Sequence, residues 1–412
     1  MMAFSPEARS NAYKESTSQE LPNACPSCGE AGLRDFYTVR EVPVHSVLLM
    51  RTASQAVSYR RGDVVLGFCP QCGFITNTAF NPHLQQYSEE CEESQGFSPT
   101  FSAFQRRLAE HLIERYNLRN KTILEIGCGK GEFLVLLCEL GPNKGIGFDP
   151  AYRSDRTPAS VADRVSFVRD FYSEKYAHVS ADFVCCKMTL EHIPDTARFV
   201  TTIRRALEGR PQTTVFFQVP DVRRILREFA FWDIYYEHCS YFSAGSMARL
   251  FRHCGFEVLD LRRAYGDQYL MLEAKPSEPS MEKILPEEED PAELASLVEA
   301  FRKGVSRKIE DWERLFNTFQ AESKRVVLWG SGSKAVAFLT TLSSPQAVSA
   351  VVDINPYRQG TFLPGTGHPI VAPESLKEQP PDVVIVMNPV YRQEISDQLG
   401  ALGVEARLLT VD

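Results

Sequence analysis

Residues 124–133, LEIGCGKGEF, decide the fold of this chain. An apolar strand ends there and runs directly into a loop with three glycines, after which a helix begins. Glycines in that position let the backbone approach a ligand closely, and they leave the amides of the helix N-terminus free for polar contacts. The sequence therefore predicts a ligand-binding loop. Its residues are Glu125, Gly127, Gly129 and Gly131.

Strands and helical stretches alternate around this loop. The expected strands are 122–126, 145–148, 183–187, 214–219, 257–262 and 269–274. Such alternation predicts an α/β fold with a mostly parallel sheet. Asp149 ends the strand that follows the loop, which is a position where an acid typically meets ribose hydroxyls. A second acid, Asp170, ends the next strand beside the aromatic Phe171.

A second α/β pattern begins near residue 321, after an acidic, proline-rich linker and a helix expected at 292–318. We expect that helix to join the last two domains. The stretch WGSGSKA contains a GxGxxA pattern at Gly330, Gly332 and Ala335, and Asp353 closes the next strand. By pattern alone, this second glycine loop is a dinucleotide-binding site.

Two near-identical knuckles, CPSCG and CPQCG, place Cys25, Cys28, Cys69 and Cys72 in CxxC pairs. A tight turn with this sequence presents two thiolates, and two such turns supply the four sulfurs of a tetrahedral zinc site. A single CxxC would equally suit a redox pair. Two matching knuckles favour structural zinc, because four thiolates leave no open coordination position. The other cysteines show no ligand spacing.

The composition is that of an ordinary globular chain. The 412 residues are 43% hydrophobic and 24% charged, and the net charge of -8 provides no overall positive field for nucleic acid or anionic membranes. Eleven cysteines, an odd number, favour a reducing compartment over a disulfide scaffold. Because we find no signal peptide and no long apolar run, we expect a cytoplasmic location.

The most unusual stretch is DIYYEHCSYFS, residues 233–243, where aromatic residues, a carboxylate and a histidine lie close together. Histidine suits proton transfer near neutral pH, and an adjacent glutamate or tyrosine sets its tautomer and basicity. Considered alone, Glu237 and His238 would more often be structural.

The first glycine loop has the form E-x-G-x-G-x-G, and acids follow the next two strands. Together with KMTLEHIPD at 187–195, this combination resembles the class I S-adenosylmethionine-dependent methyltransferases. A generic nucleotide-binding loop is the alternative. The resemblance implies that the glycine loop approaches the methionine part of S-adenosylmethionine. It also implies that Asp149 holds the ribose, and Asp170 with Phe171 the adenine.

The whole set of motifs, from the cysteine knuckles to the second α/β unit, resembles the sugar C-methyltransferases of antibiotic biosynthesis. That family has an N-terminal zinc module, a methyltransferase core and a C-terminal Rossmann-like domain. The resemblance implies that His238, oriented by Glu237, is the general base that removes a proton next to a ketone. Tyr235, His192 or Tyr87 would steady the enolate oxygen, and the enolate carbon would attack the methyl group.

The same family needs no nicotinamide, so the resemblance implies that no NAD binds at the second glycine loop. Its C-terminal domain helps to cover the substrate and to hold the nucleotide carrier. In this chain, DINPYRQGTFLPGTGHPI carries candidate substrate residues on loops of the kind that bind ligands in open α/β sheets. Solvated loop residues are the alternative. The candidates are Asn355, Tyr357, Arg358 and His368. Because the chain is acidic, a diphosphate would be met by local groups such as Arg358.

Five segments are expected. They are a flexible N-terminus (1–20), a zinc-binding module (21–98), a class I methyltransferase core (99–276), a linker with a helix (277–320) and a C-terminal Rossmann-like domain (321–412). The expected function is C-methylation of a ketone-bearing, nucleotide-linked sugar. The alternatives are an O- or N-methyltransferase of another small polar metabolite, and a non-catalytic binding protein with a degenerate cofactor pocket. The sequence names neither the substrate nor the oligomeric state.

Overall fold

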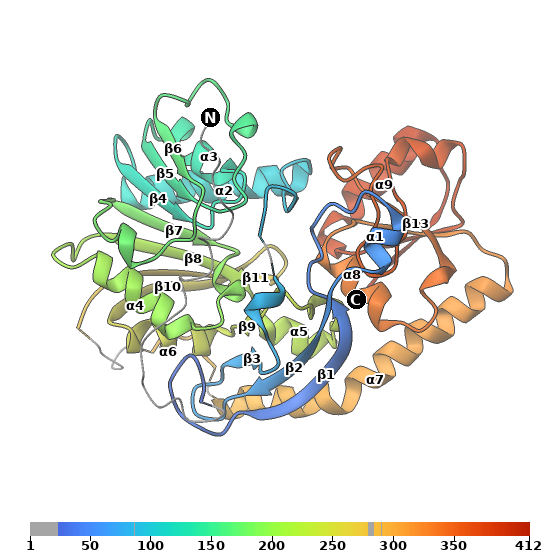
Figure 1. The fold of residues 1–412 in the computed structure, drawn as a ribbon, viewed down its shortest axis with the longest axis horizontal. Coiled ribbons are helices and arrows are strands. Elements are labelled where there is room, and N and C mark those ends of the chain that lie inside the picture. The colour runs from blue at the N-terminus through green and yellow to red at the C-terminus, as the bar shows by residue number, and fades with distance from the viewer. Residues whose placement is uncertain (1–23, 86, 279–283, 290) are drawn as a thin grey trace, which may run out of the picture.

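Three β-sheets form the framework of the chain in the computed structural model, which describes residues 24–85, 87–278, 284–289 and 291–412. In Figure 1 the core lies on the left, the C-terminal domain lies on the right, and the blue N-terminal strands run between them. The expected flexible N-terminus, residues 1–20, lies outside the described residues. No helix in the described ranges is long and apolar enough to cross a membrane.

The largest sheet carries the first glycine loop. Its strands are β4 (Thr122–Ile126), β5 (Lys144–Phe148), β6 (Val165–Val168), β7 (Phe183–Lys187), β8 (Thr214–Pro220), β10 (Phe256–Ala264) and β11 (Tyr269–Pro276). Over the described residues their order is β10-β11-β8-β7-β4-β5-β6. Neighbouring strands pair in parallel, except that β11 is antiparallel to β8 and to β10. The α/β fold with a mostly parallel sheet is confirmed.

Helices cover both faces of this sheet. They are α2 (Pro99–Tyr116), α3 (Glu132–Leu140), α4 (Thr196–Ala206) and α6 (Ala244–His253). Ile123 and Leu124 are neighbours in β4, so their side chains point to opposite faces. Ile123 packs in one apolar cluster with α2 and α3, and Leu124 packs in another with α4 and α6. The carboxyl ends of the strands remain available for the glycine loop.

The N-terminal sheet includes one strand from the core. It consists of β1 (Arg34–Pro43), β2 (Arg61–Phe68), β3 (Ile75–Asn77) and β9 (Ser240–Tyr241), paired antiparallel in that order. Two of its strands are long: β1 has 10 residues and β2 has 8. The strand β9 closes the YYEH segment, our name for residues 233–241. The N-terminal sheet therefore holds one end of that segment in place.

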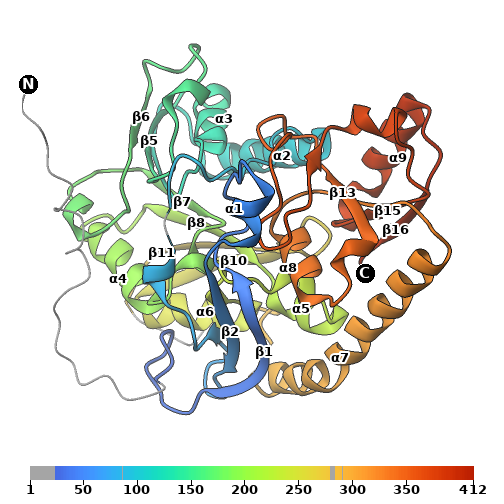
Figure 2. The ribbon, with the colours of Figure 1, turned by 45° about the vertical axis from the view of Figure 1, so that its right-hand side comes forward.

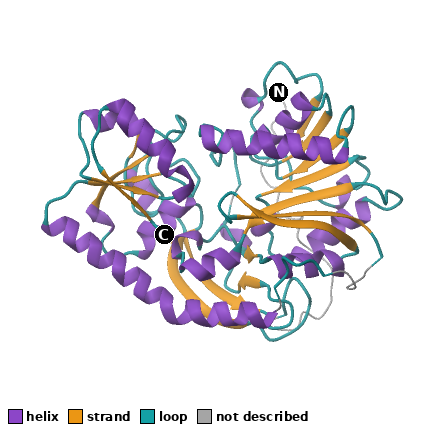
Figure 3. Ribbon diagram, turned by 180° about the vertical axis from the view of Figure 1, so that it is seen from behind, coloured by secondary structure: helices purple, strands orange, loops and turns teal. Residues whose placement is uncertain are grey.

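The C-terminal sheet is parallel throughout the described residues. Its strands are β12 (Val326–Trp329), β13 (Val348–Val352), β14 (Ile370–Val371), β15 (Val383–Val386) and β16 (Arg407–Thr410), in the order β14-β13-β12-β15-β16. After β12 the chain enters α8 (Ser333–Thr341), as the GxGxxA pattern predicts. The helix α9 (Arg392–Leu402) packs on the opposite face of the sheet. Figure 3 shows this second helix-covered sheet, which confirms the predicted Rossmann-like domain.

The long helix α7 (Pro291–Ala321) joins the core to the C-terminal domain, as we expected, and it also packs on the N-terminal sheet (Figure 2). Phe301 meets Tyr37 of β1 edge-on, with ring centroids 5.2 Å apart. Trp312 meets Phe338 of α8 at 5.0 Å. One buried apolar cluster therefore extends through all three parts of the chain. Two short helices complete the junction: α1 (Ala53–Val57) and α5 (Val222–Glu228).

Candidate active site and metal centre

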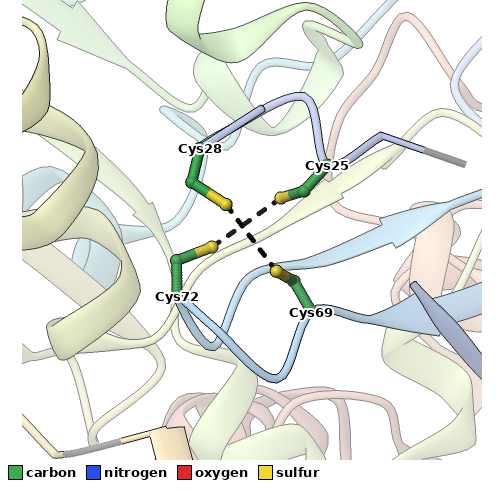
Figure 4. A group of neighbouring side chains, drawn as sticks. All are labelled: Cys25, Cys28, Cys69 and Cys72. Carbon is green, nitrogen blue, oxygen red and sulfur yellow. Dashed lines mark hydrogen bonds between the residues drawn. The ribbon is translucent and has the colours of Figure 1, made fainter. Parts of the chain in front are cut away.

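The four knuckle cysteines point toward one another across a small gap (Figure 4). Their Sγ atoms all lie within 4.8 Å of one another, and the pairs Cys25–Cys72 and Cys28–Cys69 are each 3.7 Å apart. Sulfurs bound tetrahedrally to zinc at about 2.3 Å lie about 3.8 Å from one another. A disulfide would bring two sulfurs to about 2 Å. The geometry therefore fits a zinc ion with four thiolate ligands and no open position.

Backbone hydrogen bonds close each knuckle. The N–H of Gly29 donates to the carbonyl of Cys25 at 2.8 Å, and the N–H of Gly73 donates to the carbonyl of Cys69 at 2.9 Å. Both glycines have a positive φ, 79° and 74°. Because only glycine adopts that conformation without strain, these contacts explain the glycine that follows each CxxC pair.

The first glycine loop turns sharply at the end of β4. Gly127, Gly129 and Gly131 have φ values of 68°, 54° and 83°. A Cβ on Gly127 would lie 2.0 Å from Oγ1 of Thr189, so no larger residue fits there. Glu125 is buried just before the loop, and its Oε2 has no hydrogen-bond partner within the described residues. Because a buried polar atom normally has a partner, this oxygen fits a ligand that supplies one.

The two predicted acids lie beside this loop, at the ends of β5 and β6. Oδ2 of Asp149 accepts a hydrogen bond from the backbone N–H of Gly129 at 2.8 Å. Asp170 accepts from the N–H of Phe171 at 2.8 Å and from the hydroxyl of Tyr176 at 2.7 Å. The Phe171 side chain is large and 54% exposed, so its ring is open to a stacking ligand. The structure thus brings the predicted cofactor residues to one edge of the sheet.

His238, in the YYEH segment, is buried among aromatic and titratable groups. Its Nε2 lies 3.0 Å from the hydroxyl of Tyr235, and its ring centroid is 4.9 Å from that of His192. Burial, together with the neighbouring His192, lowers the pKa of His238 well below its ordinary value. The imidazole is therefore neutral at neutral pH and able to accept a proton. Burial raises the pKa of Tyr235 well above its ordinary value, so that hydroxyl keeps its proton.

Glu237 does not orient His238, contrary to our expectation. Its carboxylate accepts hydrogen bonds from the backbone N–H of Ser46, at 2.9 Å, and from the Ser46 hydroxyl, and it lies 3.2 Å from Nδ1 of His45. Burial tends to raise the pKa of Glu237, but the hydrogen bonds from His45 and Ser46 outweigh it, so this pKa is lowered. A buried carboxylate needs several donors, and the N-terminal module supplies them.

His192 and Tyr87 complete the cluster around His238. Nδ1 of His192 lies 2.9 Å from the carbonyl oxygen of Glu237 and 3.1 Å from the hydroxyl of Tyr87. Because a carbonyl only accepts, Nδ1 carries the proton, and Nε2 of the neutral ring is an acceptor. The ring of Tyr87 is also 6.1 Å from that of Phe171, so the predicted cofactor residues adjoin the histidine cluster.

Four residues of this region were missing from the sequence predictions. His45 and Ser46 come from the N-terminal module, and Glu93 reaches the glycine loop, where a Cβ on Gly129 would lie 2.8 Å from its Oε1. No motif marks these three, because they come from distant parts of the chain. Glu191 lies in the turn after β7, within the LEHIPD motif. The sequence signal that could have identified Glu191 is its position directly before His192.

Two candidate substrate residues, Arg358 and Asn355, hold the C-terminal domain to the segment before α2. Arg358 is buried and donates to the carbonyl oxygens of Glu92, at 3.1 Å, and of Ser331, at 2.7 Å. The amide of Asn355 donates to the carboxylate of Glu92 at 3.0 Å. The guanidinium of Arg358 is therefore committed to the protein, whereas we expected it to meet a diphosphate.

The other two candidates lie apart from this contact. The Tyr357 ring is 42% exposed, and the guanidinium of Arg156 lies over it, 3.5 Å from the ring centroid. Nε2 of His368 lies 3.1 Å from the carbonyl oxygen of Pro345. Arg156 also pairs with the buried carboxylate of Glu92 at 2.7 Å, so its charge is balanced within the protein, while His368 is placed to hold a turn.

The second glycine loop faces the YYEH segment. Oγ of Ser333, in the first turn of α8, lies 2.7 Å from Oγ of Ser46, which is bonded to Glu237. A hydroxyl donates only once, so Ser333 donates to Ser46 and Ser46 donates to the carboxylate. The next residue, Lys334, pairs with the buried Asp233. The first two side chains of α8 are therefore committed to contacts with the N-terminal module and the YYEH segment.

Two family models match this chain. A model described as a methyltransferase domain matches residues 101–261, and one described as a C-methyltransferase C-terminal domain matches residues 266–407. The C-methyltransferase NovU of Streptomyces niveus is 29% identical over 310 residues, which are 71% of this chain and 72% of NovU.

Solved methyltransferase structures match part of this chain. The 1,6-didemethyltoxoflavin-N1-methyltransferase of Burkholderia thailandensis is 18% identical, with a TM-score of 0.34, over 42% of this chain and 79% of its own. The magnesium protoporphyrin IX methyltransferase of Synechocystis PCC 6803 is 14% identical, with a TM-score of 0.33, over 43% of this chain and 84% of its own.

Proposed function

We propose that this chain, which belongs to the S-adenosylmethionine-dependent C-methyltransferases, removes a proton from a carbon next to a ketone and methylates that carbon. The substrate that we propose is a nucleotide-linked ketosugar. The observation that carries the proposal is the neutral, buried His238, which lies between Tyr235 and His192 and adjoins the cofactor residues.

The first glycine loop would hold S-adenosylmethionine, which supplies the methyl group when bound. The fit rests on the positive φ values of Gly127, Gly129 and Gly131 and on the unpartnered buried oxygen of Glu125. Asp149 would accept hydrogen bonds from the ribose, because each of its carboxylate oxygens can accept more than one. Phe171 would stack on the adenine, and Asp170 would bind at its edge.

His238 would act as the general base. The C–H bond next to the ketone breaks, its electron pair enters the enolate, and the proton bonds to the imidazole. S-adenosylmethionine, which the first glycine loop would hold, would supply the methyl group to this enolate carbon and leave as S-adenosylhomocysteine. Burial of His238 excludes water from this step, which favours transfer to carbon over side reactions.

The hydroxyls of Tyr235 and Tyr87 are the donors for the enolate oxygen. Burial raises the pKa of both well above the ordinary value, so each keeps the proton that such a contact requires. His192 has its proton on Nδ1, directed at a carbonyl, so the neutral ring presents an acceptor instead. We therefore assign the oxygen contact to a tyrosine and give His192 the role of holding Tyr87 and the YYEH segment in place.

Binding and product analysis test this function. Calorimetry should show tight binding of S-adenosylhomocysteine, and its absence would make the chain a non-catalytic binding protein. With S-adenosylmethionine and a panel of nucleoside-diphosphate ketosugars, mass spectrometry should show the gain of one methyl group. NMR should then locate that group on carbon. A methyl group found on oxygen or nitrogen would instead support the O- or N-methyltransferase alternative.

The cysteine cluster would hold structural zinc. Cys69→Ser should remove the metal and lower the melting temperature by several degrees, because metal binding contributes folding free energy to such modules. Cys254→Ser is the matched control, since Cys254 is also buried but lies outside the cluster. Equal metal content in both variants, measured by mass spectrometry, would exclude zinc at this cluster.

A further inference from the structure

Glu191 is a buried carboxyl group without a hydrogen-bond partner. It lies in the turn η4 (Leu190–His192), is 1% exposed, and neither carboxylate oxygen has a hydrogen bond within the described residues. Its backbone is fixed, because its carbonyl accepts from the N–H of Cys239 at 3.0 Å. A fully buried polar group that is left unpaired destabilises the fold, so its retention calls for an explanation.

The nearest charge-bearing group is the imidazole of His238. Its Nε2 lies 4.0 Å from Oε1 of Glu191, and no Lys or Arg among the described residues pairs with this carboxyl. A carboxylate oxygen of Glu191 and one ring nitrogen each of His192 and His238 lie within 4.8 Å of one another. The titratable groups that surround Glu191 are Cys186 of β7, His192 of its own turn, Tyr235, His238 and Cys239 of the YYEH segment, and Tyr269 of β11. Within this set only a histidine can become positive.

Burial acts in opposite directions on the two groups. It raises the pKa of Glu191 to about 8 and lowers that of His238 well below its ordinary value. At neutral pH both groups are therefore uncharged, because Glu191 keeps its carboxyl proton and His238 is a neutral imidazole. The carboxylate of Asp233 also acts on His238, but it is already paired with Arg224 and Lys334, so an imidazolium at His238 has no unpaired counter-ion beside it until Glu191 ionises.

We propose that Glu191 is a positioning residue that acts through His238, as the counter-ion of the imidazolium formed when His238 takes the substrate proton. The proposal rests on the proposed function for its catalytic meaning, although the coupling of the two groups is independent of it. Glu191 first loses its proton to water. The substrate C–H bond then breaks, its electron pair remains in the enolate, and the proton bonds to the imidazole beside the carboxylate.

The coupling is measured without any substrate. The probe is the proton itself, followed by NMR through the Cε1–H resonance of His238 in the full chain, with His238→Asn for assignment. In the wild type this resonance should shift near pH 8, as Glu191 ionises, and in Glu191→Gln the shift should be absent. Glu237→Gln is the matched control. It removes a second carboxylate of the same region, which is already bonded to Ser46 and His45, and should leave the shift near pH 8 in place.

The catalytic role is measured by exchange of the proton next to the ketone in deuterated buffer. The wild-type exchange rate should rise through pH 8. Glu191→Gln should lower the rate about 100-fold and remove the rise, since a positioned acid–base group contributes about that much. Glu191→Asp keeps the charge and should recover part of the rate. A shift near pH 8 that survives in Glu191→Gln, or is absent from the wild type, overturns the proposal. A wild type that shows the shift but exchanges no proton overturns the proposed function instead.

Discussion

The two glycine loops begin alike. Each follows a buried parallel strand, opens a helix, and is followed by an acid at the end of the next strand, Asp149 in one and Asp353 in the other. In both, the acid accepts a hydrogen bond from a loop amide at 2.8 Å, Gly129 N–H for Asp149 and Ser331 N–H for Asp353. A strand, a glycine loop, a helix and a following acid are the features that a sequence pattern describes. Both loops have all four.

The loops differ in what occupies the space beyond them. The first has a buried oxygen on Glu125 that lacks a partner among the described residues, and the exposed ring of Phe171 lies at the same edge of the sheet. At the second, Ser333 reaches Glu237 through Ser46, and Lys334 pairs with Asp233. The glycine pattern therefore marks a helix N-terminus that can make polar contacts, either with a ligand or with another part of the protein. The first loop is left for a ligand, whereas the second holds the segment that carries the proposed base.

The largest expected difference between the loops appears when a glycine of each is replaced by alanine, which adds one methyl group. Gly127→Ala places a Cβ 2.0 Å from Oγ1 of Thr189, at a φ of 68°, and should weaken S-adenosylhomocysteine binding about 100-fold. Gly332→Ala meets nothing within 4 Å and has an ordinary φ of -74°, so it should bind like the wild type. Calorimetry measures both. A loss of binding in Gly332→Ala would contradict the separation of roles.

Lys334→Met should break the second loop's contact with the YYEH segment. Methyl transfer should fall about 10- to 100-fold with S-adenosylhomocysteine affinity unchanged, because Asp233 loses a buried partner and the segment moves. The control is Lys324→Met, whose pair with Asp382 is exposed at 3.4 Å and contributes little. Rate assays and binding assays on both variants would show whether the second loop acts on catalysis or on the cofactor.

The two loops can be distinguished by how two ligands, S-adenosylhomocysteine and NAD, change the stability of the chain. S-adenosylhomocysteine at about 100 times its dissociation constant should stabilise the chain by about 2.7 kcal/mol, seen as a rise in melting temperature. NAD at the same concentration should produce no rise, because Ser333 and Lys334 at the start of α8 are bonded to Ser46 and Asp233 of the protein. A rise with NAD would mean that this loop also binds a dinucleotide.

The smallest expected effect belongs to Ser333→Ala. The variant removes one neutral hydrogen bond, the one between Ser333 and Ser46, and should lower the free energy of unfolding by about 1 kcal/mol. Chemical denaturation measures the loss. No change at all would indicate that the chain from Ser333 to Glu237 does not help to hold the YYEH segment.

The sequence predicted the strands and helices better than the long-range contacts between them. The strands β4 and β7 have the predicted bounds, 122–126 and 183–187, because apolar runs next to glycine or polar residues define them locally. The predicted contact of Glu237 with His238 was wrong. Glu237 contacts His45 instead, and because these two residues are 192 positions apart, no local sequence pattern indicates the contact. The pairing of β9 with β3 and the contacts of Ser333 and Lys334 also depend on how the domains meet, which a sequence fingerprint does not record.

Proton exchange tests the central claim, that His238 generates a carbon nucleophile, most directly. The wild type and His238→Ala are incubated in deuterated buffer with the ketosugar panel and without S-adenosylmethionine, and deuterium next to the ketone is followed by NMR. The account predicts exchange by the wild type and none by His238→Ala, with S-adenosylhomocysteine binding equal in the two. Equal exchange by both, or methyl transfer by a wild type that exchanges no proton, would contradict it.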